Sequence, residues 1–389
     1  MRHTTSQRRR GNGRAAIVLV VGAMLLIASR VADAMADDDA TIAVESALPD
    51  TDWNARFEGD QGWIGGDAAY SAVLSPHRVL WLFGDTLLGT AENGKRAGAK
   101  LVNNTLGLYD PRAEHGGIRF LSGPAEEDRP TAFLRPDGQR GWFWPQGAIR
   151  LGERAYLFLA QIDKTADPGV FGFQHVGQWL AIVENPDDPP GQWRVEQKQI
   201  PFAHFGADEE RSWGSALLAD GDWVYVYGYH DATKKPGQRR MTVARVARLE
   251  LADFAAWRFR GLDEWTADPA AAAPLVPGLA TEYSVTALSP DGFLAVYTEN
   301  GLGDKIVGRR AYSPHGPWSK PVVLYRCPEM ERDQGLFSYA AKAHGWAAED
   351  GELLVSYCVN AWKFSRLFED SRVYRPRFVR IRLHGAKQR

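Results

Sequence analysis

Hydrophobic runs and short turns alternate along most of the chain, and one arrangement of them recurs five times. Each time, a strand-like run meets a tight turn and a second hydrophobic run follows directly. Two such runs around a turn are typical of a β-hairpin, and all-β units at a nearly constant spacing are typical of a β-propeller. The pattern therefore predicts an all-β fold, a five-bladed β-propeller. The five turns are Ser75-Pro76-His77, Gly152-Glu153, Asp220-Gly221, Asp291-Gly292 and Asp350-Gly351.

The predicted blades are joined by loops rich in Pro, Gly and Asp. Because such units cannot bury their hydrophobic faces alone, we expect residues 37–389 to form a single domain. Residues 41–45 are expected to form a strand that completes the last blade, and residues 249–257 a short helix. A six-bladed propeller or a β-sandwich is the alternative, and the count of five hairpins argues against both. The blades are expected at residues 60–125, 140–200, 208–262, 280–326 and 336–384.

The first 36 residues differ in character from the rest of the chain. They begin with an arginine-rich segment, which is followed by an apolar run at residues 15–28 and small residues at 32–36. The apolar run is too short to cross a bilayer comfortably, and this order of segments is typical of a cleaved leader. We therefore expect a signal peptide at residues 1–36 and a secreted or periplasmic protein without a stable membrane anchor. An uncleaved anchor is the alternative.

Composition excludes one class of partner. With 46 Lys and Arg against 48 Asp and Glu, the formal net charge is −2, so the sequence offers no basic surface for nucleic acid. No residue spacing is typical of a zinc site, and we expect no metal ion, no cofactor and a monomer. The two cysteines, Cys327 and Cys358, allow two interpretations, which are one disulfide bond or two buried thiols.

Two aspartates carry the main prediction about chemistry. Residues that pair across a hairpin have numbers with a constant sum, and about Pro76 this rule places Asp67 opposite Asp85. Like charges directly opposed destabilise a sheet, so the arrangement suggests a function. When two carboxyls lie close together, the pKa of one of them rises and that group keeps its proton. An acid then lies beside a base, which is the pair of groups that glycoside hydrolysis uses. We expect Asp67 to be the more exposed of the two and the weaker candidate for the raised pKa. The alternative is a slipped register with one aspartate capping a turn.

The same rule brings polar or aromatic residues of the other hairpins to one rim. It pairs Trp144 with Gln161, Ser212 with Tyr229, Glu282 with Glu299, Lys342 with Val359, and Ala341 with Asn360. A ring of such groups is what a sugar-binding funnel requires, although most aromatic residues are expected in the core and the two glutamates could be solvated edge charges. The predicted substrate-binding residues are Asn104, Trp144, Gln146, Trp213, Tyr229, Glu282, Glu299, His344 and Asn360.

Short motifs in the first and last predicted blades resemble a bacterial family of five-bladed propeller glycoside hydrolases. They are Gly-Gly-Asp67, Leu-Trp-Leu-Phe-Gly-Asp85-Thr86, Asn103-Asn104-Thr105, Ser356-Tyr357-Cys358-Val359-Asn360 and Tyr374-Arg375-Pro376-Arg377-Phe378. The family was long catalogued as a domain of unknown function, and some members are endo-acting D-arabinofuranan hydrolases. The resemblance implies a catalytic aspartate pair at Asp67 and Asp85 and a polysaccharide substrate. Cys358 stands where a polar residue is common in relatives. The alternatives are a non-catalytic lectin and, with less support, a lyase or phosphorylase.

Overall fold

The computed structural model describes residue 1 and residues 42–113, 116–167, 172–235, 237–288, 292–348 and 351–384. The chain divides into two compact units, residues 1–41 and 42–389. Apart from Met1, the predicted signal peptide lies outside the described residues, and so does the predicted turn at Asp291. The second unit is an all-β structure, as predicted, and its strands form antiparallel sheets.

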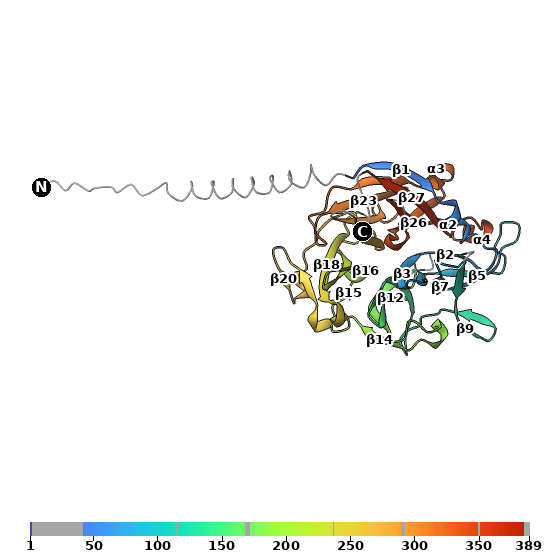
Figure 1. Ribbon diagram of the computed structural model, residues 1–389, viewed down its shortest axis with the longest axis horizontal. Coiled ribbons are helices and arrows are strands. Elements are labelled where there is room, and N and C mark those ends of the chain that lie inside the picture. Colours follow the sequence, from blue (N-terminus) through green and yellow to red (C-terminus); the bar gives the residue numbers. More distant parts are fainter. Residues whose placement is uncertain are drawn as a thin grey trace. The chain divides into compact units, whose positions relative to one another are not determined.

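Five sheets in the described part of the chain have four or more strands. Their strands follow one another along the sequence, and Figure 1 shows the sheets arranged about the middle of the unit. The first sheet contains β3 (Tyr70–Ser75), β4 (Arg78–Phe83), β7 (Thr105–Tyr109) and β8 (Ile118–Leu121). The second contains β11 (Trp142–Leu151), β12 (Arg154–Lys164), β13 (Phe173–Val183) and β14 (Val195–Gln199). The third contains β15 (His204–Phe205), β16 (Glu210–Asp220), β17 (Trp223–Asp231), β18 (Arg240–Ala247), β19 (Arg258–Arg260) and β20 (Trp265–Thr266).

The fourth sheet contains β21 (Tyr283–Ala287), β22 (Phe293–Thr298), β23 (Lys305–Ala311) and β24 (Val322–Arg326). The fifth contains β25 (Leu336–Ala343), β26 (Glu352–Ala361), β27 (Pro376–Leu383) and β1 (Val44–Pro49). Two smaller sheets are formed by β2 (Gln61–Gly66), β5 (Thr86–Thr90) and β6 (Lys100–Val102), and by β9 (Gly123–Glu126) and β10 (Arg129–Thr131).

The N-terminal strand closes the fifth sheet, which otherwise comes from the C-terminal part of the chain. Strand β1 pairs with β27, with Ala47 opposite Ile381 and Leu48 opposite Arg380. The predicted closing strand is therefore confirmed, but it begins at Val44 and ends at Pro49 rather than spanning residues 41–45. This pairing gives β27 a partner on both edges, so the strand has no free edge.

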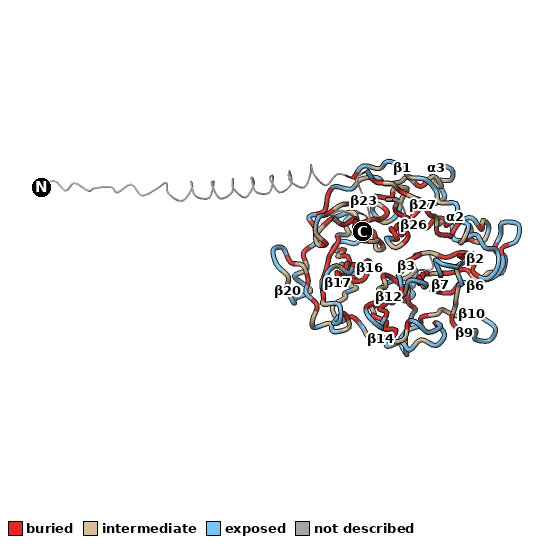
Figure 2. Tube along the Cα trace, in the orientation of Figure 1, coloured by how far each residue is buried: buried red, intermediate tan, exposed pale blue. Residues whose placement is uncertain are grey.

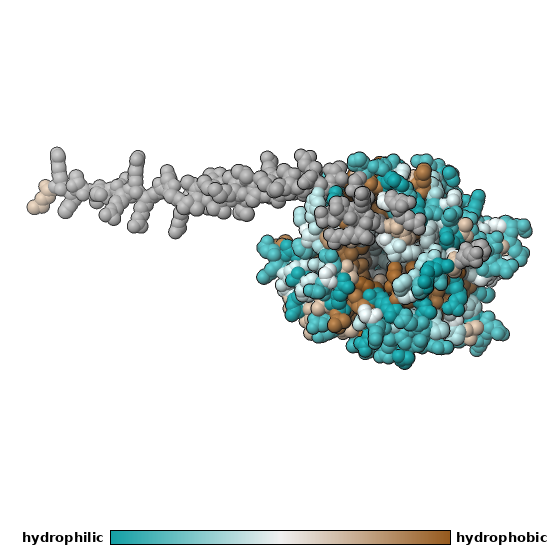
Figure 3. Space-filling model, in the orientation of Figure 1, coloured by the Kyte–Doolittle hydropathy of each residue, from teal (hydrophilic) through white to brown (hydrophobic). Residues whose placement is uncertain are grey.

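Successive sheets pack through one strand each, with β3 beside β11, β11 beside β16, β16 beside β21 and β21 beside β25. A narrow cavity of about 220 Å³ lies among these five strands and is lined by residues from each of them. The fifth sheet joins the first through His344, whose Nδ1 is 2.6 Å from Oγ of Ser71. Figure 3 shows a hollow near the middle of the face in view, with hydrophobic residues gathered around it.

The core lies between the sheets, and Figure 2 shows buried residues along the strands and exposed residues in the outer loops. On β17, Val224 and Val226 pack into one hydrophobic cluster, whereas Tyr225 and Tyr227 pack into another. Successive side chains of a strand point to opposite faces, so this sheet is covered on both sides, as the alternating pattern predicts. The cysteine question is also answered, because Cys327 and Cys358 are both buried free thiols.

Helices are short in the described residues. They are α2 (Thr51–Ala55), α3 (Glu329–Arg332) and α4 (Arg366–Glu369), with single 3₁₀ turns at η1 (Pro190–Gln192), η4 (Pro269–Ala271) and η5 (Gly345–Ala347). The helix predicted at residues 249–257 is wrong, because that segment holds two separate 3₁₀ turns, η2 (Arg248–Glu250) and η3 (Phe254–Ala256). Within the described ranges, no helix has the length and apolar character needed to span a membrane.

Candidate active site

The first hairpin brings the two predicted aspartates together. In the β3–β4 ladder Tyr70 lies opposite Leu82, and in the β2–β5 ladder Gly66 lies opposite Thr86. Both pairs have the same sum of residue numbers, so Asp67 and Asp85 occupy facing positions between the two ladders. The backbone N–H of Asp67 donates to the carbonyl oxygen of Asp85 over 3.3 Å, which confirms the predicted register.

The aspartates occupy a bend in this hairpin. Strands β2 and β5 continue β3 and β4 beyond the bend but belong to a separate sheet. Ala68 and Ala69, which follow Asp67, have φ values of 65° and 52°. These left-handed conformations are costly for residues with a Cβ, and they turn the chain sharply where the first carboxyl projects. A Cβ at Gly84 would lie 2.5 Å from Oδ1 of Asp67, so glycine leaves the space that this carboxyl occupies.

Two tyrosines from the end of the chain hold the carboxyl of Asp67. Tyr339 on β25 donates its hydroxyl hydrogen to Oδ2 over 2.7 Å, and Tyr374, just before β27, donates to the same oxygen over 3.0 Å. Burial, followed by the charges of Asp85 and Glu282, raises the pKa of Asp67 to about 8, although the two tyrosine hydrogen bonds act in the opposite direction. At neutral pH this carboxyl therefore keeps its proton.

Asp85 has different partners, which belong to neighbouring parts of the fold. Its Oδ1 accepts hydrogen bonds from Nε1 of Trp144 over 2.8 Å and from Nδ2 of Asn103 over 3.2 Å. Burial raises the pKa of Asp85 to about 6, and these two hydrogen bonds oppose the rise. The expectation that Asp67 would have the less raised pKa is therefore wrong. The two glycines before Asp67 suggest exposure, but the tyrosines of the fifth sheet cover it.

A third carboxylate lies close enough to act on this pair electrostatically. Glu282 accepts a hydrogen bond from Nζ of Lys342 over 2.8 Å, and its negative charge contributes to the raised pKa of Asp67. Lys342 is itself buried, donates to the carbonyl oxygen of Ala340 and lies 4.2 Å from the centre of the Tyr70 ring. The Lys342–Glu282 ion pair therefore lies directly beside the aspartate pair.

Several of the other predicted pairings are wrong, and irregular strands explain why. A register shift between Pro145 and Ala148 places Trp144 opposite Ala160 instead of Gln161. Ser212 does lie opposite Tyr229. In the fourth sheet the ladder starts with Tyr283 opposite Tyr297, so Glu282 does not face Glu299. Glu299 forms an ion pair with Lys305 at 3.0 Å instead.

The pairing predicted for the last hairpin is wrong, by three residues at Lys342 and by four at Asn360. Lys342 lies opposite Ser356 and Asn360 lies opposite Phe337. The 3₁₀ turn at residues 345–347 lengthens this connection, and the ladder shifts again between Tyr339 and Lys342. Asn360 nevertheless reaches the site, because its Nδ2 donates to the hydroxyl of Tyr339 over 3.4 Å.

Five predicted substrate-binding residues are buried inside the protein. Trp213 is 1% exposed and packs against Phe259 with ring centroids 5.0 Å apart. A side chain covered in this way cannot contact a polysaccharide from solvent, so these positions are corrected to structural roles. Asn104 donates hydrogen bonds to the backbone carbonyl oxygens of Leu134 and Phe143, and Gln146 accepts one from Gln178. The ring of Tyr229 packs beneath Arg239. His344 is hydrogen-bonded to Ser71 and Ser356.

The predicted residues that do meet at the bend are Asp67, Asp85, Trp144, Glu282 and Asn360. The sequence reasoning missed the roles of Asn103, Tyr339, Tyr374 and Lys342 there. Tyr374 and Asn103 lie within motifs that were recognised, but Tyr339 carries no local signal. Arg375 and Arg377 of the same motif do not reach the aspartates, because Arg375 binds backbone carbonyls at Phe57 and Gly59 and Arg377 pairs with Glu58 at 3.4 Å.

No group of three or more His, Cys, Asp or Glu side chains suited to a metal ion occurs among the described residues. Together, the fold and the bend define an all-β protein with an opposed acid and carboxylate on one hairpin. The chain belongs to the family described as "Domain of unknown function (DUF5005)", whose model matches residues 50–384.

One solved structure shares this fold. It is described as a "putative hydrolase" from Bacteroides ovatus ATCC 8483, and it is 20% identical, covers 88% of this chain and 94% of its own, and has a TM-score of 0.68. An α-L-arabinofuranosidase from Lactobacillus brevis is 13% identical over 81% of this chain and 90% of its own, but its TM-score of 0.48 supports no argument.

A curated relative matches a smaller part of the sequence. Notoamide biosynthesis cluster protein J from Aspergillus sp. (strain MF297-2) is 27% identical over 139 residues, which are 36% of this chain and 36% of that protein. The match thus spans about a third of the relative's length.

Proposed function

We propose that this protein is a glycoside hydrolase in which Asp67 is the general acid and Asp85 the general base. One observation carries the proposal: the two carboxyls occupy facing positions on one hairpin, where burial raises the pKa of Asp67 to about 8 and that of Asp85 to about 6. Between these values Asp67 holds a proton and Asp85 is ionised. An acid that can protonate the leaving oxygen then stands beside a base that can take a proton from water, which is what cleavage of a glycosidic bond requires.

The directions in which the two carboxyls are held favour an inverting reaction. Asp67 is drawn toward Tyr339 and Tyr374 near the fifth sheet, whereas Asp85 is drawn toward Trp144 on the second sheet. Facing positions on paired strands start with Cβ atoms about 5 Å apart, and side chains that diverge from there leave room for a water molecule. Inverting enzymes separate their carboxyls by roughly 6.5–9.5 Å for this reason.

In the proposed reaction, Asp85 takes a proton from a water molecule while the oxygen of that water bonds to the anomeric carbon. The glycosidic bond breaks in the same step, and Asp67 gives its proton to the leaving oxygen. Proton NMR of the first-formed product tests the stereochemistry. Inverted configuration is expected, and a trapped glycosyl–aspartate adduct would contradict it.

The substrate we propose is a polysaccharide, and more narrowly an arabinofuranan attacked within the chain. The support is the set of motifs around Asp67, Asp85 and Tyr374, which resemble those of endo-acting D-arabinofuranan hydrolases. The partly exposed ring of Trp144, which packs on Phe173 with centroids 4.7 Å apart, offers an aromatic surface beside Asp85.

We also propose that the five large sheets are the blades of a five-bladed propeller. Their order about the central cavity and the closing pair β1–β27 support this arrangement. The leader-like residues 1–36 support export to the periplasm or beyond. We accordingly propose that the protein is a monomer that acts on external glycan, has no stable membrane anchor and binds no nucleic acid.

The deciding experiment is hydrolysis of a panel of polysaccharides that includes arabinans and xylans. Release of oligosaccharides by the wild-type protein, and its loss in Asp67→Asn and Asp85→Asn, is the expected result. Binding of a glycan with no cleavage by the wild-type protein would support the lectin alternative. Release of unsaturated products would indicate a lyase.

A further inference from the structure

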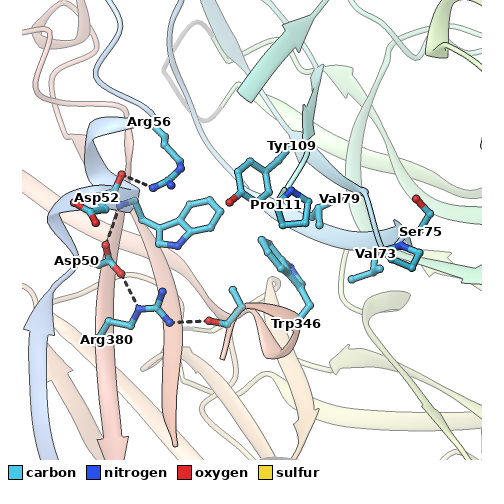
Figure 4. Close-up of a pocket in the computed structure, with 13 residues that line it drawn as sticks. Asp50, Asp52, Arg56, Val73, Ser75, Val79, Tyr109, Pro111, Trp346 and Arg380 are labelled. Atoms are coloured by element: carbon cyan, nitrogen blue, oxygen red, sulfur yellow. Dashed lines mark hydrogen bonds and ion pairs between the residues drawn. The ribbon is translucent and has the colours of Figure 1, made fainter. Parts of the chain in front are cut away.

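A second pocket of about 550 Å³ lies at the other end of the first sheet (Figure 4). Three parts of the chain form it: the segment around α2, the β3–β4 hairpin with the end of β7, and the fifth sheet with its 3₁₀ turn. The lining residues used below are Asp50, Trp53, Arg56, Tyr109, Trp346 and Arg380.

This pocket is separate from the aspartate pair. Strand β3 runs from Tyr70, just after the bend at Asp67, to the turn at Ser75, and Ser75 lines the pocket. A strand of 6 residues spans roughly 20 Å. A ligand in the pocket therefore does not touch Asp67 or Asp85, and the pocket is not an extension of the proposed catalytic cleft.

The charged groups of the pocket are held in fixed positions by one another. Asp50 accepts hydrogen bonds from Nε of Arg380 over 2.7 Å and from the backbone N–H of Trp53 over 2.9 Å. Arg380 also donates to the carbonyl oxygen of Ala347 over 2.7 Å. Two carboxylates, Asp50 and Asp52, balance two guanidinium groups, Arg56 and Arg380, so the pocket has no net formal charge.

One polar atom in the pocket remains to be satisfied. Tyr109 is only 8% exposed, and among the described residues its hydroxyl has no hydrogen-bond partner. Figure 4 shows this hydroxyl directed toward Trp53 at the centre of the lining residues. This hydroxyl is not one of the buried polar atoms that lack a partner, so it is open to the pocket and can both donate to and accept from a polar ligand.

The aromatic rings complete the chemistry of the pocket. Trp346 is half-buried, and its indole Nε1 donates to Oγ of Ser71 over 2.8 Å, which fixes the ring. Its ring centroid lies 5.7 Å from that of Trp53 and 5.9 Å from that of Tyr109. Rigid aromatic walls beside fixed polar groups are typical of small-molecule sites.

These features discriminate among ligand classes. A cationic ligand would be repelled by the guanidinium of Arg56, which already lies 4.7 Å from the centre of the Trp53 ring. A purely apolar ligand would leave the Tyr109 hydroxyl unpaired and cover the Asp50–Arg380 pair. A neutral sugar fits, because its C–H face can lie on an aromatic ring while its hydroxyls both donate and accept hydrogen bonds.

We propose that this pocket is a non-catalytic site for one sugar residue of a polysaccharide. The inference rests on the proposed glycan-directed function, and it adds a second contact with the same class of substrate. Two linked contacts raise the apparent affinity for a long chain well above that of either site alone. The protein would thereby remain on its substrate between cleavage events.

Native gels that contain soluble arabinan, arabinogalactan or xylan test this proposal. The full-length Asp85→Asn protein is used, so that the polysaccharide stays intact. We expect at least one polysaccharide to retard it, and Val73→Trp in this background to weaken the retardation about tenfold. Val73 is 43% exposed and lines the pocket, so the larger ring fills the space without removing a core contact.

Val323→Trp is the matched control, because Val323 is a strand valine of similar exposure, 39%, on β24 outside the pocket. It is expected to migrate like its parent. Tyr109→Phe, which keeps the ring and removes the hydroxyl, is expected to weaken retardation by a smaller factor. Equal retardation of the Val73→Trp protein and its parent, or no retardation of the parent in any of the three gels, would overturn the inference.

Hydrolysis by the wild-type protein on the same polysaccharides separates the two proposals. If the wild-type protein cleaves a polysaccharide but the Val73→Trp protein is retarded as strongly as its parent, the second site is wrong and the hydrolase proposal stands. Retardation that depends on Val73 without cleavage means that the hydrolase proposal fails and the sugar site stands.

Discussion

The hydroxyl of Tyr374 donates a hydrogen bond to Oδ2 of Asp67 over 3.0 Å, although 307 residues separate them in the sequence. The proposed acid is thus held by the first and last parts of the unit at once. The site is complete only when the fifth sheet has closed against the first. Catalytic competence and closure of the fold are therefore expected to depend on the same contacts.

Tyr374→Phe is expected to move the alkaline limb of the pH–rate profile to higher pH. The tyrosine hydrogen bond favours the ionised form of Asp67 and lowers its pKa, so removing it lets the acid keep its proton further into the alkaline range. The measurement is kcat/KM against pH. Tyr312→Phe, at a hydroxyl on a 54% exposed side chain, is the control. A limb that moves to lower pH would contradict the role of Tyr374.

The wild-type protein is expected to show a bell-shaped dependence of kcat/KM on pH. Activity falls below about pH 6 as Asp85 gains a proton and above about pH 8 as Asp67 loses one. Because the two carboxyls interact, the measured limbs belong to the pair. A single limb, or a profile flat from pH 5 to pH 9, would show that the pair does not govern the reaction.

Asp67→Asn and Asp85→Asn are expected to differ in a way that identifies the acid. Each should lose about 10²–10⁴-fold in rate on polysaccharide. On an aryl glycoside whose leaving group needs no protonation, Asp67→Asn should recover most of its activity and Asp85→Asn should not. The reverse result would exchange the two roles.

Asp67→Asn is also expected to resist unfolding better than the wild-type protein at pH 8. Burial raises the pKa of Asp67 from its ordinary value of 3.8 to about 8 in the folded protein. The folded state therefore holds a proton that the unfolded chain releases, and stability falls as the pH rises from about 4 to about 8. Asparagine removes this loss, and melting temperatures at pH 5 and pH 8 measure it. A lower melting temperature for the variant at pH 8 would contradict the buried, protonated state.

Trp213→Ala is expected to destabilise the fold by about 3–5 kcal/mol, because it empties a core position of a large ring. Denaturant unfolding measures this loss. Trp144→Phe is the contrasting variant, since Trp144 is partly exposed and donates to Asp85. It should keep most of the stability and move the acidic limb of the pH–rate profile upward. A stable Trp213→Ala protein with weakened glycan binding would restore the original assignment of this residue to the site.

The sequence by itself determined the all-β class, the closing N-terminal strand and the facing positions of Asp67 and Asp85. These features depend on local physics. Alternation of apolar residues selects strands, and a tight turn at Pro76 sets the pairing of β3 with β4 up to the point where the hairpin bends. The same rule failed for Trp144 and Lys342, because the register shifts in those two hairpins have no clear signature in the sequence. It failed for Glu282 because that regular ladder is one residue out of the predicted register.

Tertiary structure alone decided which of the two aspartates keeps its proton and which aromatic rings reach solvent. The pKa of Asp67 depends on burial and on the charge of Glu282, and two tyrosines from a distant part of the chain oppose its rise. Trp213 and Trp144 occupy similar positions in their hairpins, yet one is covered by neighbouring rings and the other lies beside Asp85. Burial and electrostatic environment come from groups that meet only when the sheets pack, and no local pattern in the sequence records them.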